Sequence, residues 1–254
     1  MTAPVFGDRA EELTRGLAAV RSRLAQAAEA AGRPVTQIQL LPITKFFPAT
    51  DAAILWRLGC RAFGESREQE ASAKIAEFDT MIGAAPDSRP VRWHMVGQVQ
   101  RNKAKHIAEW ADTVHSVATT KVVAALDRGA AQALAGGKRR GRLRVLVQIS
   151  LDGDTARGGV DISDPAAVDL LCTQVADAGS LEFAGLMAVP PRGAEPDRAF
   201  AALATEHRRV LRDHPAATEL SAGMSGDLEA AVRHGSTCVR VGTALMGRRP
   251  LTSP

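Results

Sequence analysis

The chain has 254 residues, of which 45% are hydrophobic and 24% are charged, as in an ordinary globular protein. This length is close to the roughly 250 residues of a TIM barrel, and a chain of this size can bury a core without disulfides or metals. The net charge of +4 is small, no run reaches the ~18 consecutive apolar residues of a membrane span, and the first residues lack the pattern of a signal peptide.

The first predicted element is an amphipathic helix from Asp8 to Ala31. Its apolar residues recur at alternating steps of four and three, which places them on one helix face. They are Leu13, Leu17, Val20, Leu24, Ala27 and Ala31. Gly32 and Pro34 are expected to end the helix.

After this helix, apolar runs of strand length alternate with helical patterns. The predicted strands are Ile38–Lys45, Arg61–Gly64, Val91–Gly97, Thr113–Val117, Leu143–Ser150, Leu181–Val189, Glu219–Met224 and Cys238–Leu245. The predicted helices between them are Asp51–Leu58, Glu68–Phe78, Asn102–Trp110, Thr120–Ala135, Pro165–Ala178, Arg198–Arg212 and Leu228–His234. Eight strands separated by helices favour a parallel sheet. We expect a single (β/α)8 TIM-barrel domain over residues 1–254, with an extra N-terminal helix.

Pro42 lies inside the first predicted strand, where a closed barrel has no edge and proline loses a ladder hydrogen bond. We interpret it as a local bulge, and a doubly wound open sheet remains the alternative architecture. The glycine- and proline-rich stretches are short enough to be barrel loops; they are Gly83–Pro90, Gly136–Gly141, Asp152–Gly159 and Pro190–Pro196. The basic run Gly136–Arg144 has no interleaved aromatic residues, so we interpret it as a solvated loop and expect no nucleic-acid partner.

The cysteines and histidines point away from disulfide and metal chemistry. Cys60, Cys172 and Cys238 are odd in number, widely spaced and surrounded by apolar residues, which indicates buried thiols in a reducing cytoplasm. The six histidines show no spacing typical of a metal pair, and Gly-x-Ser-x-Gly, Gly-x-Gly-x-x-Gly and Walker patterns are absent. We expect a cytoplasmic protein with no metal and no membrane partner.

Lys45 ends the first predicted strand, in the run Leu40-Leu-Pro-Ile-Thr-Lys45. Functional residues of a barrel gather at the carboxyl ends of its strands. Partial burial there disfavours the charged amine, and an uncharged amine can attack an aldehyde to form a Schiff base. A lysine at a strand end can also extend its ammonium group into solvent, and position alone favours this second interpretation.

The loops after the last two predicted strands have the composition of a barrel phosphate site. They read Leu220-Ser-Ala-Gly-Met-Ser-Gly-Asp227, where a short helix is expected to begin, and Val239-Arg-Val-Gly-Thr-Ala-Leu-Met-Gly247. Glycine lets the backbone approach phosphate oxygens closely. Backbone N–H groups and hydroxyls are offered by Ser225, Gly226, Gly242 and Thr243. Two ordinary turns could have the same composition.

Arg240 lies on the last predicted strand, beside these loops. Its guanidinium could pair with a phosphate, with a carboxylate or with a pyridine nitrogen. At a pyridine nitrogen, it would keep that atom unprotonated and make the ring a weaker electron sink.

Six motifs, in this order, resemble the pyridoxal-phosphate homeostasis protein family, which is related to the N-terminal barrel of alanine racemase. They extend from Leu40 to Gly247 and include the two loops above. The other four are Leu41-Pro-Ile-Thr-Lys45, Phe63-Gly-Glu-Ser-Arg-Glu-Gln-Glu70, Trp93-His-Met-Val-Gly-Gln-Val-Gln-Arg-Asn-Lys103 and Gly185-Leu-Met-Ala-Val-Pro-Pro191. No single motif is specific, but six in the right order are.

The resemblance implies a cofactor and a role for each site residue. Lys45 would bind pyridoxal 5′-phosphate (PLP) covalently as a Schiff base, and Arg240 would face the pyridine nitrogen. Met224 and His94 would line the ring. The phosphate would be held by Ser225, Gly242 and Thr243, with Gly226 in the same loop.

The sequence departs from the family pattern at the expected mouth of the pocket. The family usually has asparagine where Ser66 stands, tyrosine where Arg67 stands and histidine where Gln98 stands. It usually has a Lys-Ser/Thr-Gly run where Arg157-Gly158-Gly159 occurs. These changes leave the lysine and the phosphate loops intact and put the contacts at the ring edge in doubt.

The resemblance favours a monomeric PLP-binding protein of intracellular PLP homeostasis or carriage, with little or no catalysis, which passes PLP to amines or to apo-enzymes. A PLP-dependent amino-acid racemase is one alternative. It needs a second acid/base on the other face of the cofactor, which the related enzyme is understood to take from a tyrosine, and this sequence has no tyrosine. A class I aldolase-like Schiff-base barrel is the other alternative, and it would lack the yellow colour of bound PLP.

Overall fold

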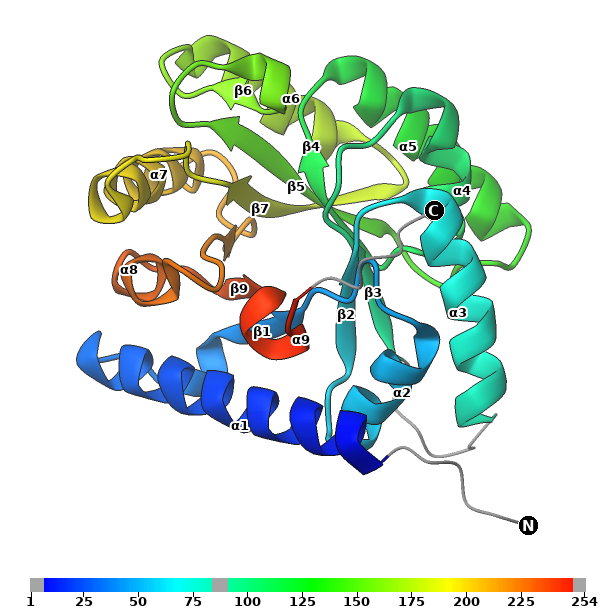
Figure 1. The fold of residues 1–254 in the computed structure, drawn as a ribbon. Helices are drawn as coiled ribbons and strands as arrows, with labels where there is room; N and C mark the ends of the chain where they lie inside the picture. The colour runs from blue at the N-terminus through cyan, green and yellow to red at the C-terminus, as the bar shows by residue number, and fades with distance from the viewer. Residues whose placement is uncertain (1–6, 84–90, 249–254) are drawn as a thin grey trace.

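The computed structural model describes residues 7–83 and 91–248, and within these ranges a ring of strands is surrounded by helices (Figure 1). The strands follow the order β1-β9-β8-β7-β5-β4-β3-β2 in one sheet. A parallel bridge between Ile43 and Gly64 then connects the segment after β1 to β2, so that the barrel is nearly closed. The expected TIM barrel is confirmed, and the open-sheet alternative is wrong.

All strand pairings of this sheet are parallel. The strands are β1 Gln39–Pro42, β2 Ala62–Glu65, β3 Arg92–Met95, β4 Thr113–Val117, β5 Leu143–Ser150, β6 Val160–Asp161, β7 Leu181–Ala188, β8 Glu219–Ser221 and β9 Cys238–Val241. The short β6 was not predicted and pairs with β5 outside the barrel path. The last two strands end before the predicted Met224 and Leu245, because the chain turns there into the loops at the barrel mouth.

The helices occur where the sequence places them, with shifts of a few residues at their ends. They are α1 Gly7–Ala30, α2 Ala49–Arg57, α3 Glu68–Ile82, α4 Ala104–Trp110, α5 Thr120–Ala135, α6 Pro165–Asp177, α7 Pro196–Val210, α8 Leu228–Arg233 and α9 Thr243–Met246, with short 3-10 turns at Val35–Gln37, Arg101–Lys103 and Thr155–Arg157. The start of α6 illustrates how the sequence marks the beginning of a helix. Asp164 accepts a hydrogen bond from the Ala167 N–H at 3.0 Å, and Pro165 occupies the first turn. The short helix α9 was predicted as strand.

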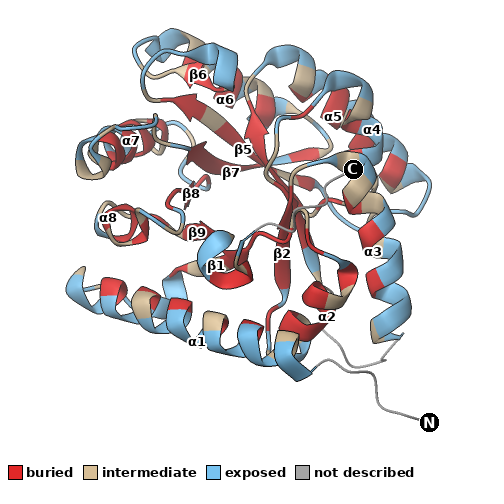
Figure 2. Ribbon diagram, viewed as in Figure 1, coloured by how far each residue is buried: buried red, intermediate tan, exposed pale blue. Residues whose placement is uncertain are grey.

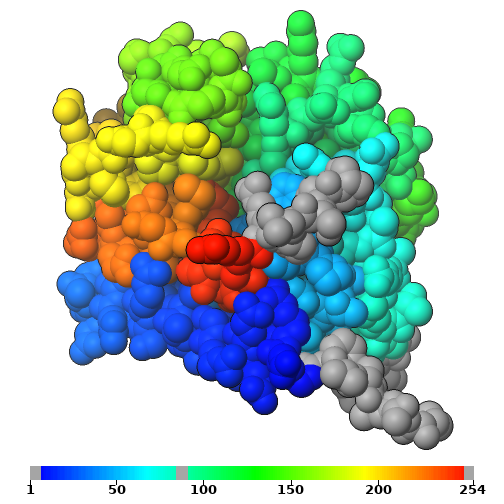
Figure 3. Space-filling model, viewed as in Figure 1, coloured from blue at the N-terminus to red at the C-terminus, as the bar shows by residue number. Residues whose placement is uncertain are grey.

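The N-terminal helix α1 lies outside the barrel and packs against α2, α8 and α9 (Figure 1). Leu13, Leu17, Val20 and Leu24, on the predicted apolar face, are buried. In the space-filling view, the residues of α9 lie between α1 and the α8 region (Figure 3). The first helix of the chain therefore supports its last elements, which carry one side of the barrel mouth.

Pro42 does not form the expected bulge. The pairing of β1 with β9 is continuous from Gln39 to Pro42, which lies opposite Val241. The Ile43 N–H donates to the Val241 carbonyl at 2.9 Å and the Thr44 N–H to the Gly64 carbonyl at 3.0 Å, so alternate residues of this segment face β9 and β2. Pro42 is tolerated because its nitrogen faces β2, where the only pairing recorded for the described residues is the Ile43–Gly64 bridge.

Most of the buried apolar side chains lie between the strands and the helices, and the outer helix faces are exposed (Figure 2). Inside the barrel, two small apolar groups, one around Leu41 and Ala62 and one around Leu146 and Met187, are separate from this layer. Polar side chains fill the remaining interior. The three cysteines are buried and free, as expected, and no helix in the described ranges is long and apolar enough to cross a membrane.

Residues 84–90 of the first predicted loop lie outside the described residues. The basic run after α5 is largely an exposed loop, as expected. Arg139, however, turns inward and donates to the Ala108 and Ala111 carbonyls at 3.0 and 2.6 Å, so that part of its charge serves to fix the loop.

Candidate functional site

A cavity of about 430 Å³ opens at the carboxyl ends of the strands. Its lining residues come from the segments after β1, β3, β7 and β8 and from the end of β9. Seven of the eight predicted site residues line it: Lys45, Met224, Ser225, Gly226, Arg240, Gly242 and Thr243. One wall is apolar and consists of Ile43, Val96, Val189 and Met224. The cavity thus joins an apolar surface, a lysine, an arginine and two hydroxyls.

Lys45 lies in a turn and not, as predicted, at the end of a strand. β1 ends at Pro42, and the Phe47 N–H closes the turn by donating to the Thr44 carbonyl at 3.1 Å. Phe46 has a φ of 69°, the left-handed region that costs a bulky residue energy and is often found at functional sites. The Lys45 Nζ lies 5.8 Å from the Phe46 ring centroid. From this turn the half-buried Lys45 reaches the cavity.

A buried polar cluster, which sequence reasoning missed, anchors this turn. Thr44 donates through its hydroxyl to Glu65 Oε1 at 2.6 Å, and the Lys74 Nζ donates both to that oxygen at 2.6 Å and to the Thr44 carbonyl at 2.8 Å. Burial raises the pKa of Glu65, although the Lys74 ammonium opposes that effect. A signal was present in the sequence, because Lys74 lies between Ala71 and Phe78 on the buried face of α3.

The two loops after β8 and β9 are connected to each other and to α1. The Ser225 hydroxyl accepts a hydrogen bond from the Ala244 N–H at 3.2 Å, which joins the first loop to α9. Arg23 of α1 donates to the Ser225 carbonyl at 3.1 Å and pairs with Glu229 of α8 at 2.8 Å. The backbone around Ser225 is therefore fixed from two sides.

Gly226 and Gly242 are not required by the fold itself. A Cβ atom on Gly226 would meet nothing within 4 Å, and one on Gly242 would lie 3.7 Å from the nearest atom, an ordinary contact. Gly242 has a φ of −106°, outside the left-handed region that favours glycine. Gly223 in the same loop is different, because its φ is 90° and a Cβ would come within 2.5 Å of Ala231. The space left at Gly226 and Gly242 belongs to the cavity.

Arg240 is a buried cation with neutral partners. It is 6% exposed, and it donates to the Ser221 hydroxyl at 2.6 Å and to the Ala188 carbonyl at 2.9 Å. Within the described residues no carboxylate forms an ion pair with it, and burial lowers the pKa of its guanidinium. Arginine nevertheless stays charged. A buried charge without a counter-ion favours an anion or a hydrogen-bond acceptor in the adjoining cavity.

His94 is not among the residues that line the cavity. It lies deeper in the barrel, two positions before Val96 on β3, and is 3% exposed. Its Nδ1 lies 2.8 Å from Nε2 of His115, whose Nδ1 lies 2.9 Å from the Ser221 hydroxyl. Burial, with Arg92 and Arg144 nearby, lowers the pKa of His94 to about 3, and burial also lowers that of His115 far below its usual value. Both imidazoles are therefore neutral at physiological pH.

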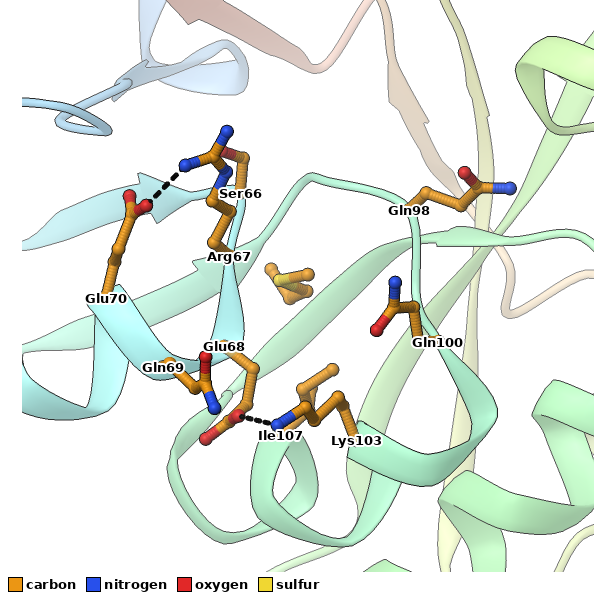
Figure 4. Close-up of a pocket in the computed structure, with 10 residues that line it drawn as sticks. Ser66, Arg67, Glu68, Gln69, Glu70, Gln98, Gln100, Lys103 and Ile107 are labelled. Atoms are coloured by element: carbon orange, nitrogen blue, oxygen red, sulfur yellow. Dashed lines mark hydrogen bonds and ion pairs between the residues drawn. The ribbon is translucent and has the colours of Figure 1, made fainter. Parts of the chain in front are cut away.

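A second hollow of about 340 Å³ lies between the ends of β2 and β3 (Figure 4). It contains three of the residues that depart from the family pattern, Ser66, Arg67 and Gln98. Its charges pair within the hollow: Arg67 with Glu70 at 2.7 Å and Lys103 with Glu68 at 3.6 Å. None of the predicted site residues lines it, although the Arg67 guanidinium lies 5.5 Å from the centroid of the Phe46 ring, next to Lys45.

Comparisons with known proteins agree with this geometry. The family described as the alanine racemase N-terminal domain matches residues 16–250. The chain is 61% identical over 249 residues, 98% of its length, to a pyridoxal phosphate homeostasis protein of Mycobacterium leprae, 97% of which is covered. It is also similar to PipY of Synechococcus elongatus, solved with PLP bound, at 32% identity and a TM-score of 0.75 over 92% of this chain and all of that one.

A more distant likeness supports the fold alone. Alanine racemase from Corynebacterium glutamicum is 17% identical, with a TM-score of 0.64. The match covers 96% of this chain but 63% of the racemase.

Proposed function

This chain belongs to the family of pyridoxal phosphate homeostasis proteins, and on that premise we propose that it holds PLP in the mouth cavity as a Schiff base on Lys45. The name of the relatives and the PLP-bound PipY support the choice of cofactor. The proposed role is carriage and homeostasis of PLP with little or no catalysis, by a cytoplasmic monomer with a single domain. Apo PLP-dependent enzymes are the proposed recipients.

The observation that carries this proposal is the placement of three complementary groups around one cavity. Lys45 comes from one side, the loops with Ser225 and Thr243 from another, and the unpaired cation of Arg240 from the interior. A cavity of about 430 Å³ is within the size range of small-ligand sites. An aldehyde, a phosphate and a ring nitrogen are the three functional groups that this set would recognise, and PLP has all three.

Each group would have a separate task. PLP supplies an aldehyde, which reacts with one amine and can be transferred from that amine to another. Lys45 provides the amine, and the strained turn at Phe46 keeps it directed to the cavity. Ser225 and Thr243 provide hydroxyls for the phosphate, while Gly226 and Gly242 leave room for its oxygens. Arg240 donates to the ring nitrogen and keeps it unprotonated, which weakens the ring as an electron sink and limits catalysis.

The phosphate assignment is tested with the double variant Ser225→Ala/Thr243→Ala. Each lost hydrogen bond to a charged group is expected to cost about 1.5 kcal/mol or more, so PLP should bind roughly 100-fold more weakly. Pyridoxal, which has the aldehyde and no phosphate, should lose little. Dissociation constants for both compounds are measured by absorbance titration. An equal loss for the two compounds would show that these hydroxyls do not bind phosphate.

The space at Gly242 gives a second test. Gly242→Ala should leave the folded protein as stable as the wild type, because a Cβ is accommodated there, yet weaken PLP binding by about tenfold or more through contact with the phosphate. Gly179→Ala, at an open position far from the cavity, is the matched control and should change neither property. Urea unfolding and PLP titration measure the two effects, and unchanged PLP affinity in Gly242→Ala would contradict the proposed phosphate position.

A further inference from the structure

A chain of buried hydrogen bonds runs from the mouth cavity into the barrel interior. It connects Arg240 on β9, Ser221 on β8, His115 on β4 and His94 on β3, with successive distances of 2.6, 2.9 and 2.8 Å. All four side chains are at most 6% exposed. The four strands are not neighbours in one run of the sheet, so the chain crosses the barrel interior.

Donors and acceptors allow two directions for this chain of hydrogen bonds, and one of them suits the charge of Arg240 better. Arg240 can only donate, so Ser221 Oγ accepts from it. If the Ser221 hydroxyl then donates to Nδ1 of His115, that imidazole carries its proton on Nε2 and donates to Nδ1 of His94. The only polar atom left without a partner is His94 Nε2, which is buried and has none in the described part of the protein.

The reverse direction is less favourable. Ser221 Oγ would have to accept from both Arg240 and His115, and its own proton would go to the sulfur of Cys238, a weak acceptor. His94 Nε2 remains unpaired in either direction, so the two directions differ in how their dipoles are oriented and not in the number of unsatisfied groups. When the hydrogen bonds run from Arg240 towards His94, every N–H and O–H dipole points away from the Arg240 cation, which is the electrostatically favourable orientation.

We propose that Ser221 and His115 are positioning residues for Arg240, which together present its guanidinium to the cavity in one orientation, as a donor only. This inference rests on the proposed function, and it names what that site selects: a ligand whose facing atom is an aromatic nitrogen with a free lone pair. Arg240 is held at two nitrogens, by Ser221 and by the Ala188 carbonyl. Without Ser221 the guanidinium keeps one anchor and can turn.

The direction in which these hydrogen bonds run can be measured in the ligand-free wild-type protein. Nitrogen-15 NMR of the histidine side chains distinguishes the two neutral tautomers from each other and from the charged form. We expect a proton on Nε2 and none on Nδ1 for both His94 and His115 at pH 6. A proton on Nδ1 of His115 would mean that the hydrogen bonds run in the reverse direction. That result would overturn the proposal, whatever ligand the protein binds.

The positioning role is tested by ligand preference. Wild-type protein should bind PLP about tenfold more tightly than an analogue in which C–H replaces the ring nitrogen, the difference expected for one hydrogen bond to a charged group. Ser221→Ala and His115→Phe should reduce this preference to about threefold or less. His115→Asn, whose side-chain oxygen can accept from Ser221, should restore part of it. Ser236→Ala removes another fully buried serine, one that donates to the Ala222 carbonyl at 2.7 Å, and should keep the wild-type preference.

The outcomes separate the two proposals. A wild-type protein that binds neither compound overturns the proposed function and the ligand assignment with it. A wild-type protein that binds PLP without preferring it to the analogue overturns the positioning role alone. The positioning role is also overturned if Ser221→Ala weakens the binding of both compounds equally. A loss of stability would affect the binding of both, whereas a loss of Arg240 orientation would affect only the compound with a ring nitrogen.

Discussion

Replacing Lys45 by alanine should abolish the borohydride-stable attachment of PLP to this protein. A Schiff base needs a primary amine, and Lys45 is the lysine that lines the mouth cavity. Lys74 lies against the same turn but is buried, and its Nζ is bonded to Glu65 and to the Thr44 carbonyl at 2.6 and 2.8 Å. It cannot replace Lys45 without breaking the cluster that holds the turn. We therefore expect a loss of at least about 100-fold in trapped PLP, with no second site taking over.

The measurement combines absorbance with mass spectrometry of peptides after reduction. Wild-type protein should show a visible absorbance band with PLP and one modified peptide containing Lys45, and Lys45→Ala should show neither. Lys103→Ala is the matched control, because Lys103 lies at the same end of the barrel but in the second hollow, paired with Glu68 (Figure 4). It should retain full labelling. A yellow adduct of unchanged stoichiometry in Lys45→Ala would show that the attachment site is wrongly assigned.

The order of strands and helices was predictable because each element carries its own periodicity. The alternating steps in α1 and the apolar runs at β4 and β5 indicate their elements without tertiary information, and these bounds agree closely with the structure. Strand ends were less predictable. β9 ends at Val241 and Thr243–Met246 is helical, although the run remains apolar, because the chain must turn at the barrel mouth.

Much of the candidate site could be predicted because its residues follow strands, and the carboxyl ends of parallel strands meet at one end of a barrel. Lys45 and Thr243 are far apart in sequence but line one cavity. What the sequence could not provide is depth along a strand. His94 lies on β3 and Val96 directly follows the strand, two positions later; Val96 reaches the cavity while His94 lies below it. The network behind Arg240 was likewise out of reach, because β4, which carries His115, is not a neighbour of β8 or β9 in the sheet and meets them only across the barrel interior.

The buried histidines add a consequence for stability. His94 and His115 are neutral in the folded protein, with the pKa of His94 lowered to about 3 and that of His115 also lowered far below its usual value. In the unfolded chain, both should titrate near the ordinary value of about 6.5. Between these values the unfolded state binds more protons than the folded state. The free energy of unfolding therefore falls as the pH falls below about 6.5, and the loss continues until the folded pKa is reached.

We expect two such histidines to contribute a slope of up to about 2.7 kcal/mol per pH unit between pH 6 and pH 4, about half of it from each. His94→Gln removes one of the two protons, so its unfolding free energy should depend on pH less steeply by about 1.4 kcal/mol per unit, even if the variant is less stable at pH 7. His106→Gln replaces an exposed histidine of α4 and should keep the wild-type slope. Urea unfolding at several pH values measures all three slopes. Equal slopes for wild type and His94→Gln would mean that His94 takes up its proton in the folded barrel as readily as in the unfolded chain, which the enclosed position beside Arg92 and Arg144 opposes.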